Sequence, residues 1–289
     1  MADDDSKGPG RKIGVFYLHR RGNRKTLLRT FLASLKGNPT NLDFSLFIIC
    51  KGFEEASLEK KTSSWSKYLK QPVNLIYVGD EGFDLTAYRT AAARTDVDYC
   101  LFFNSYAVIL APRWLETYAA CVPLLGENFL VGATGSYARW GLDEPFENVG
   151  EPFERAHIRT NAFFIPRKLY LSFDEPFSTK MDCYMFESGP DNISQRILRS
   201  GGFIALVDRQ GRIILPGDWP DSRTFFSGRQ ENLLVADNHT HYYQTSKVRR
   251  RKRLSSGVWG RDRGNAEADS WLARKLWKLS REYGVGTGP

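Results

Sequence analysis

The sequence predicts an α/β protein in which a mostly parallel sheet has helices on both faces. Short apolar segments of strand composition alternate with segments whose apolar residues recur at helical spacing. The connections between these segments are short, which favours parallel pairing with right-handed crossovers. The 289-residue chain is 42% hydrophobic, so it can bury a sizeable core and does not have the composition of a disordered protein.

The first hundred residues show the alternation most clearly. We expect residues 1–11, which are acidic and contain Gly and Pro, to form a disordered leader. A strand follows over 13–18, and the apolar residues after Asn23 then recur at helical spacing. The further elements expected in this half are a strand over 44–50, a helix over 54–68, a strand over 73–78, a helix over 85–94 and a strand over 99–103.

The second half is predicted to be less regular. It begins with a helix that contains Trp114 and includes an irregular stretch over 135–152. Gly189-Pro190 opens a helix, because Pro suits the first helical position. Residues 217–243 are polar and aromatic without periodicity, so we expect loops that line a site. The regular elements expected here are strands near 129–132 and over 160–165, 203–207 and 212–215, and a helix over 191–199.

The distribution of charge separates a domain over 12–245 from a basic tail over 246–289. The tail contains twelve Lys/Arg and four Asp/Glu, so it carries the whole net charge of +8. The neutral body has no field that would steer a polyanion onto it. The run over 247–253 has three interpretations: a solvated tail, an arm that contacts an anionic membrane or a partner, and a lid that closes on a diphosphate. An amphipathic helix with an apolar stripe is expected beyond it, from Ala268 to Tyr283.

Cysteine usage and hydropathy indicate the compartment. Cys50, Cys100, Cys121 and Cys183 are far apart and lack both a CxxC pair for zinc and the dense spacing of a disulfide scaffold. The N-terminal residues lack the apolar core of a signal peptide. The longest uncharged stretch, 99–112, is too short to cross a bilayer of about 30 Å as a helix. We therefore expect a cytoplasmic protein, peripheral to a membrane where the tail binds one.

Two consecutive stretches of the sequence carry the candidate function. In the first, an apolar strand is followed by Gly82-Phe83-Asp84 and by a helix that carries Arg89. In the second, an apolar strand ends in Asn104-Ser105-Tyr106 before a helix that begins with Pro-Arg-Trp-Leu. Their order and spacing resemble the first half of family-2 glycosyltransferases of the GT-A fold. No P-loop, dinucleotide fingerprint, nucleophile elbow or HExxH motif is present, which argues against those chemistries.

The resemblance covers about residues 12–210 and implies a GT-A-like catalytic domain. Its implied activity is transfer of a sugar from a nucleotide-sugar donor, a UDP- or GDP-sugar, to a hydroxyl acceptor on a glycan or protein. In that family an Asp-x-Asp motif holds a divalent ion on the diphosphate, because hard oxygen ligands suit Mg²⁺ or Mn²⁺. Here neutral Asn104, Ser105 and Tyr106 stand in its place. Two outcomes remain open, a metal-independent enzyme or a fold that has lost catalysis.

Basic side chains are candidates to replace the metal. A cation about 4 Å from a phosphate oxygen contributes several kcal/mol at an effective dielectric constant near 20. The candidates are His19, Arg20, Arg89 and the run over 247–253.

Polar residues at the expected strand ends each have two interpretations. Asn104 and Ser105 either contact the donor or form a simple strand-ending turn. Asp84 either faces the nucleotide or caps the helix that begins at Leu85. Lys51 stands where the family usually has an acidic uridine contact, so the donor base stays open.

The candidate general base lies in the segment 180–191, which resembles the acidic motif at the start of a late helix in the same family. An inverting transfer needs one carboxylate to take the proton of the acceptor hydroxyl. Glu187 matches best, and Asp191 is the reserve. The alternative for both is a structural role, as a helix cap or in an ion pair.

Residues 237–241 form a second cluster of interest. On a strand, Asp237, His239 and His241 would share one face and could bind a metal or a phosphate. A solvent-facing loop is the competing interpretation. Trp219 could stack on a sugar, whereas Trp114 at a helix start suits the core.

Three functions therefore compete. The leading one is a glycosyltransferase, and the second is a non-catalytic glycan- or nucleotide-binding module on the same fold, favoured by the missing carboxylates. The third, nucleic-acid binding by the arginine-rich tail, is disfavoured because the body is neutral and lacks a stacking motif.

Overall fold

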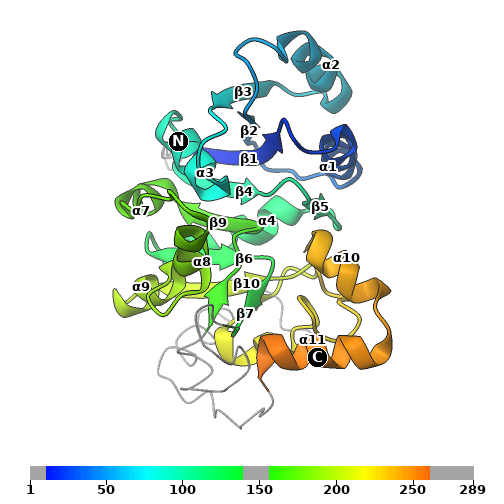
Figure 1. The fold of residues 1–289 in the computed structure, drawn as a ribbon, viewed down its shortest axis with the longest axis vertical. Coiled ribbons are helices and arrows are strands. Elements are labelled where there is room, and N and C mark those ends of the chain that lie inside the picture. The colour runs from blue at the N-terminus through cyan, green and yellow to red at the C-terminus, as the bar shows by residue number, and fades with distance from the viewer. Residues whose placement is uncertain (1–10, 139–155, 261–289) are drawn as a thin grey trace, which may run out of the picture.

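The main sheet has eight strands. A computed structural model of the chain describes residues 11–138 and 156–260. The strand order is β11-β10-β6-β9-β4-β1-β2-β3 (Figure 1). The strands of this sheet are β1 Ile13–Arg20, β2 Ser45–Lys51, β3 Val73–Val78, β4 Tyr99–Phe103, β6 Phe129–Gly132, β9 Ala162–Pro166, β10 Phe203–Val207 and β11 Ile213–Ile214.

The amino-terminal half of the sheet is parallel throughout. β1 pairs in parallel with both β2 and β4, and β2 pairs in parallel with β3. β9 runs antiparallel to its neighbours β4 and β6, and β10 is parallel to β6. The chain order reverses at β1, since β2 and β3 lie on one side of it and β4 on the other. The predicted α/β class with a mostly parallel sheet is confirmed.

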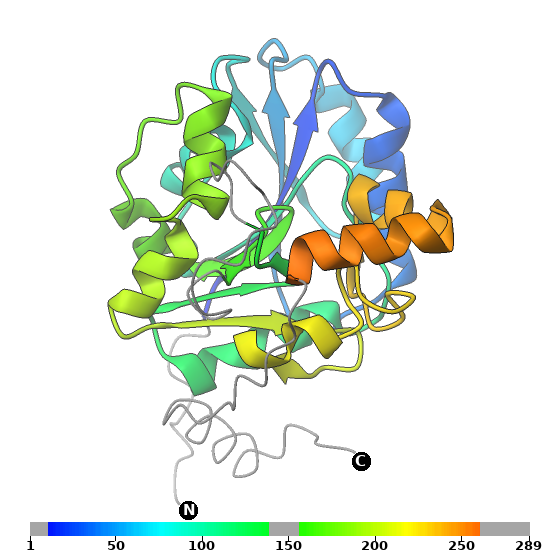
Figure 2. The same cartoon turned by 60° about the horizontal axis from the view of Figure 1, so that its bottom comes forward.

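Helices cover both faces of the sheet (Figure 2). Side chains of the first group pack into the same buried cluster as alternate residues of β1, and those of the second group pack into the cluster on the opposite face. The first group is α1 Lys25–Gly37, α2 Glu59–Leu69, α4 Trp114–Ala119 and α5 Cys121–Leu125. The second group is α3 Asp84–Ala93, α7 Arg167–Ser172, α8 Lys180–Ser188 and α9 Ile193–Arg199.

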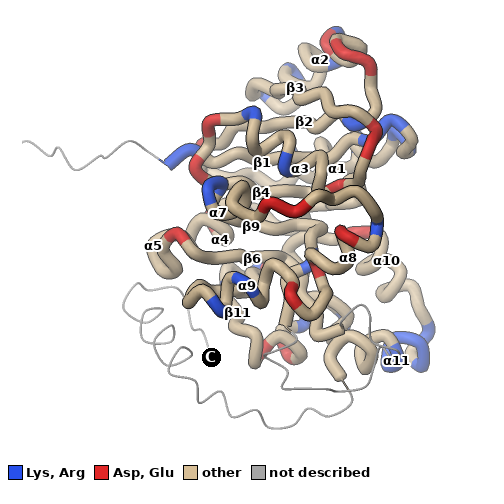
Figure 3. The backbone as a smooth tube through the Cα atoms, turned by 60° about the vertical axis from the view of Figure 1, so that its left-hand side comes forward, with Lys and Arg blue, Asp and Glu red and all other residues tan. Residues whose placement is uncertain are grey.

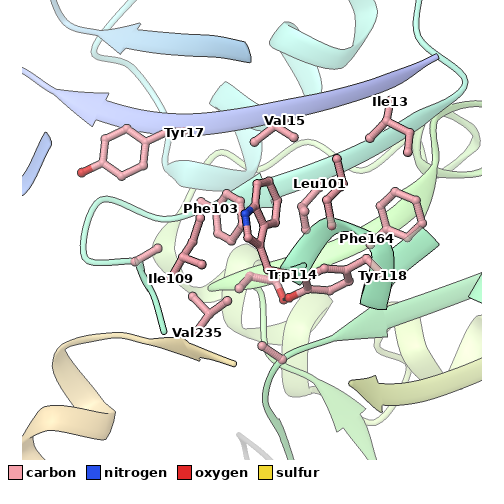
Figure 4. Close-up of a cluster of buried hydrophobic side chains, with 14 of the residues drawn as sticks. Ile13, Val15, Tyr17, Leu101, Phe103, Ile109, Trp114, Tyr118, Phe164 and Val235 are labelled. Atoms are coloured by element: carbon pink, nitrogen blue, oxygen red, sulfur yellow. The ribbon is translucent and has the colours of Figure 1, made fainter. Parts of the chain in front are cut away.

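Aromatic packing on the α1 face fixes the position of α4 (Figure 4). Trp114 is fully buried, lies edge-on to Phe103 at 5.9 Å between ring centroids and donates its indole N–H to the carbonyl of Asn38 at 3.0 Å. Phe31 of α1 stacks on Tyr17 of β1 at 4.1 Å. The core interpretation of Trp114 is confirmed, and these contacts hold α1 against the carboxyl half of β1.

Two of the expected elements differ from the structure for local reasons. The helix expected over 54–68 begins only at Glu59, because Ala56 has a left-handed backbone with φ 61°. The region 217–243 is not all loop: it contains the 3₁₀ helix η1 Pro216–Asp221, the short strand β12 Val235–Ala236 and the helix α10 Asn238–Thr245. β12 pairs antiparallel with β5 Val108–Ile109, which shares its face with α1. A further short pair joins β7 Gly135–Ser136 to β8 His157–Ile158.

The first part of the predicted tail packs on the domain. Residues 248–259 form α11 Val248–Trp259, which lies at the end of the molecule opposite α2 (Figure 1). Trp259 is buried, donates its indole N–H to the carbonyl of Phe225 at 3.1 Å and lies edge-on to Tyr137 at 5.2 Å. The leader over 1–10, most of the stretch 135–152 and the helix expected after Ala268 lie outside the described residues. Among the described helices, none combines the length and the apolar character needed to cross a membrane.

Replacing Trp259 by Ala tests whether α11 is an integral part of the fold. Loss of this buried indole should lower the free energy of unfolding by about 3 kcal/mol, measured by denaturant unfolding of the full chain. Val248→Ala is the control, because Val248 is 59% exposed at the other end of the same helix and should change stability little. Equal stability of the two variants would show that α11 is detached in solution.

Candidate active site

The candidate site lies at the carboxyl ends of β1 and β4. In open α/β sheets ligands bind outside the strand ends at the point where the strand order reverses. Ser105, directly after β4, is buried there and donates its hydroxyl to the carbonyl of Leu18 at 2.8 Å. Tyr17 donates its phenol to the carbonyl of Ser105 at 2.7 Å. The Ser105 side chain is therefore committed to holding the two strand ends together.

Asn104 connects this edge to the strand on its other side. Its backbone N–H donates to the carbonyl of Asn161 at 2.9 Å. Its side-chain oxygen accepts the N–H of Tyr106 at 3.0 Å, which closes the turn. These contacts show the strand-ending turn expected as one interpretation of Asn104 and Ser105.

The residues at this turn do not fit a divalent cation. The oxygens of Asn104 and Ser105 are engaged in the hydrogen bonds just described. Across residues 11–138 and 156–260, no three His, Cys, Asp or Glu side chains gather in a way that could hold a metal ion.

Glu187 faces this edge from the last turn of α8. Its Oε2 accepts the backbone N–H of Thr160 at 2.9 Å and also the Thr160 hydroxyl. Both bonds go to one oxygen, and Oε1 has no hydrogen-bond partner in the described part of the chain. The helix expected over 191–199 is present as α9, but Glu187 lies before it in a helix that was not expected, α8, which begins at Lys180, where Thr179 forms a capping box with Asp182.

Asp84 is the second carboxylate of the site. It occupies the first turn of α3, and its Oδ1 accepts the N–H of Leu85 at 3.1 Å. Burial and then the negative charge of Glu187 raise the pKa of Asp84, against smaller opposing effects that include the ammonium group of Lys51. Two carboxylates from helices α3 and α8 thus influence each other across this edge. We call Asp84 and Glu187 the carboxylate pair.

A buried phenol lies beneath the carboxylate pair. Tyr88, one turn after Asp84 on α3, is fully buried, and its hydroxyl has no hydrogen-bond partner among residues 11–138 and 156–260. Burial and then the charge of Asp84 raise the pKa of Tyr88 well above its usual value. A neutral phenol is a hydrogen-bond donor that needs an acceptor. Near the carboxylate pair, that acceptor could be an oxygen of a protonated, rearranged carboxyl group or an oxygen of a ligand.

A third group approaches Glu187 from α10. Asp237 is buried, caps α10 by accepting the N–H of Thr240 at 2.8 Å, and pairs with Arg159 at 3.1 Å. Partial burial and then the charge of Arg159 lower the pKa of His239, while the charges of Asp237 and Glu187 act in the opposite direction. His239 is thus influenced by Arg159, Asp237 and Glu187 together, while its side chain remains exposed. The guanidinium of Arg159 also lies over the ring of Phe225 at 4.0 Å.

Residues 237–241 form neither the strand nor the solvent-facing loop that were the two interpretations of this cluster. These residues form the cap and first turn of α10, where alternate side chains do not share a face. The structure separates their roles: Asp237 caps the helix and pairs with Arg159, His239 lies near Glu187, and His241 is exposed. The stacking expected of Trp219 is also wrong, because its side chain is fully buried and donates to the carbonyl of Ile214 at 2.9 Å.

Two of the predicted cations, Arg20 and Arg89, form ion pairs away from the carboxylate pair. Arg20 pairs with Asp80 at 3.2 Å after β3. Arg89 donates to the carbonyl of Glu175 at 2.9 Å and pairs with Asp174. These two cations hold surface loops and are not brought to the carboxylate pair by the described contacts.

The remaining predicted residues have separate environments. Asp191 pairs with Arg196 at 2.9 Å and with Arg199, so it ties the start of α9 to its end. Lys51 is buried and donates to the carbonyls of Gly79 at 3.2 Å and Glu81 at 2.7 Å. His19 is buried beside Phe53, and burial, with the nearby charge of Lys61, lowers its pKa to about 4.

Sequence reasoning did not single out Arg159 and Thr160. Both directly precede β9, and they reach the site because β9 runs antiparallel to β4, so that its amino end lies at the carboxyl end of β4. The sequence signal was present, since the polar run Arg159-Thr160-Asn161 precedes an apolar strand. The antiparallel direction of β9, which brings this polar run to the site, was not predicted.

Comparison with known proteins gives a distant likeness only. No family model and no curated protein matches the sequence. Among solved structures, a mannosyltransferase from Pyrobaculum calidifontis in complex with GDP-Man and Mn²⁺ is 11% identical with a TM-score of 0.47, covering 96% of this chain and 76% of that one. The apo form of the glycosyltransferase GlyE from Streptococcus pneumoniae is 14% identical with a TM-score of 0.45, covering 95% and 64%. S. aureus TarS is 13% identical with a TM-score of 0.42, covering 92% and 47%.

The chain therefore spans less than two thirds of the length of GlyE and about half that of TarS. All three TM-scores are below 0.5.

Replacing Asp84 by Asn tests the electrostatics of the carboxylate pair. Because the folded protein raises the pKa of Asp84, ionisation of this group opposes folding at neutral pH. Asp84→Asn should therefore raise the unfolding midpoint at pH 7, and the gain should shrink as pH falls through the raised pKa and vanish below about pH 3.8.

Thermal unfolding across this pH range provides the measurement. Asp80→Asn is the matched control with the opposite sign, because the hydrogen bond from Arg20 lowers the pKa of Asp80. A loss of stability for Asp84→Asn at pH 7 would contradict the arrangement.

Proposed function

We propose that the protein is a glycosyltransferase that moves a sugar from a nucleotide-sugar donor to a hydroxyl acceptor with inversion, with Glu187 as the general base. One observation carries the proposal: the carboxylate pair lies at the carboxyl ends of β1 and β4, where the strand order reverses, and one oxygen of Glu187 has no hydrogen bond to any described residue. Ligands of open α/β sheets bind at such a point. The family resemblance of the residues around Asp84 and Asn104 agrees with this assignment.

The chemistry assigned to Glu187 is proton removal from the acceptor. Thr160 holds Oε2, so Oε1 can accept the acceptor hydroxyl proton as the acceptor oxygen bonds to the anomeric carbon. On the opposite face of that carbon the bond to the donor diphosphate breaks, and the diphosphate leaves with the electron pair. Asp84 is proposed to contact the ribose or base of the donor while it begins α3.

The described contacts also favour the second candidate, a non-catalytic glycan- or nucleotide-binding module. Asn104 and Ser105 supply no charge to a diphosphate, and Arg20, Arg89 and Arg159 are each paired with a carboxylate. A leaving diphosphate needs compensating positive charge. A module that binds a neutral sugar would need none.

Glu187→Gln separates catalysis from binding. The amide keeps the size of the side chain and can accept the bonds from Thr160, but it cannot take a proton, so sugar transfer or donor hydrolysis should fall by about 10²- to 10⁴-fold. The measurement is sugar release from UDP-glucose, UDP-N-acetylglucosamine and GDP-mannose. Glu55→Gln makes the same chemical change at an exposed position and should leave the rate unchanged.

The reserve base is tested in the same assay. A large loss in Asp191→Asn together with an unchanged rate in Glu187→Gln would move the base to Asp191. Nucleotide-sugar binding without any turnover in the unsubstituted protein, measured by thermal shift with Mn²⁺ or with chelator, would instead support the binding module. That comparison also reports whether a metal contributes.

The basic run is proposed to contact an anionic membrane surface or an acidic partner. Lys247, Arg249, Arg250, Lys252 and Arg253 are exposed on and just before α11, where the blue segment gathers in Figure 3. None of them forms an ion pair with any residue of 11–138 or 156–260. A cytoplasmic location remains a prediction, and nucleic-acid binding stays disfavoured for the reasons of charge distribution given above.

A further inference from the structure

A pocket of about 930 Å³ lies between α1, α2 and the end of β1. It is on the α1 face of the sheet, because His19 alternates along β1 with Leu18, which packs toward α3. The carboxylate pair approaches from α3 and α8, on the other face. α1 and α2 lie side by side at this end of the molecule (Figure 1).

The lining of this pocket is cationic. Arg21, Lys25, Arg29 and Lys61 line it, and no Asp or Glu does. Arg21 approaches Glu54 outside the lining at 3.8 Å, with both side chains largely exposed. Lys25, Arg29 and Lys61 have no ion pair with any carboxylate that the structure describes. Like charges around one cavity repel each other, and an anion inside it would relieve that repulsion.

The same pocket presents aromatic side chains. Trp65 is half-buried and Tyr68 is 42% exposed, both on α2, and Phe53 contacts His19 with 4.8 Å between ring centroids. The ammonium of Lys36 lies 4.0 Å from the centre of the Tyr68 ring. Such rings can pack on a nucleobase or on the C–H face of a sugar.

α2 packs on the core only in part. It has no fully buried side chain, and Trp65 and Leu69 reach the core only partly. It ends at Leu69, directly before Lys70, which has a left-handed backbone with φ 59°. Lys61, Trp65 and Tyr68 of α2 therefore remain available to line the pocket.

We propose that this pocket binds an organic phosphate, with the phosphate oxygens held by Arg29 and Lys61 and the ring of the ligand packed on Trp65. Guanidinium and ammonium groups form charge-assisted hydrogen bonds with phosphate oxygens. The ligand is a nucleotide or a sugar phosphate, which share this chemistry. The inference rests on the pocket lining alone and stands apart from the proposed transferase activity.

Isothermal titration of the full chain tests the proposal with four probes: UDP, glucose 1-phosphate, inorganic pyrophosphate and uridine. The double variant Arg29→Ala/Lys61→Ala should weaken binding of the tightest organic phosphate by about tenfold or more, since each charged hydrogen bond contributes substantially. Arg24→Ala/Lys60→Ala is the matched control, because it removes the same charges from the N-cap of α1 and from the first turn of α2, outside the pocket lining. It should leave binding nearly unchanged.

A third variant, Trp65→Leu, tests the ring contact. It should weaken binding of the organic phosphate and leave that of pyrophosphate unchanged. Preference for UDP over glucose 1-phosphate identifies a nucleotide, and the reverse identifies a sugar phosphate. Glu187→Gln should not alter this binding, so the result is independent of the proposed general base.

Two outcomes would overturn the proposal. One is that neither organic phosphate binds better than uridine. The other is that the two double variants weaken binding equally, which would mean that binding depends only on the general positive charge of the surface.

Discussion

The two hydrogen bonds of Ser105 hold the carboxyl ends of β1 and β4 together, and the rest of the site depends on that closure. The Ser105 hydroxyl reaches the carbonyl of Leu18, and the phenol of Tyr17 reaches the carbonyl of Ser105. Both bonds are buried, so neither group could exchange its partner for water without cost. With this edge fixed, the backbone N–H of Asn104 donates to the carbonyl of Asn161, directly before β9. The adjacent residue Thr160 then donates its own N–H to Glu187.

Successive side chains of β1 point to opposite faces of the sheet. A cationic cavity lies on one of these faces, and the carboxylate pair comes from helices on the other. His19 points to the α1 face, where unpaired cations surround a cavity, and the carboxylate pair is built from helices of the other face. A diphosphate and a pair of carboxylates repel each other unless positive charge lies between them. The neutral turn at Asn104 supplies no such charge, and Arg159 is already paired with Asp237.

The regular part of the fold could be predicted from the sequence because buried parallel strands are continuous apolar runs. Strands β3, β4, β6 and β10 have the predicted bounds. The site could be predicted only in part. Glu187 and Asp84 were selected because the segments around them resemble a known family, and the fold brings them near each other. Arg159 and Thr160 reach the site only through the antiparallel direction of β9, which local sequence does not encode. The capping box of Asp237 and Thr240 converts an apparent alternating pattern into a helix start.

The position of Glu187 on α8 bears on what this residue is for. A negative charge in the last turn of a helix is disfavoured by the helix dipole, whereas the same charge in the first turn is favoured. A purely structural acid would therefore suit the start of α8, where Asp182 completes the capping box. Glu187 instead lies at the end of α8, near a second carboxylate, and the two hydrogen bonds from Thr160 offset part of that electrostatic cost. Glu187 thus lies where the helix dipole does not favour an acid, and the proposed role as general base gives a reason for a carboxylate at this position.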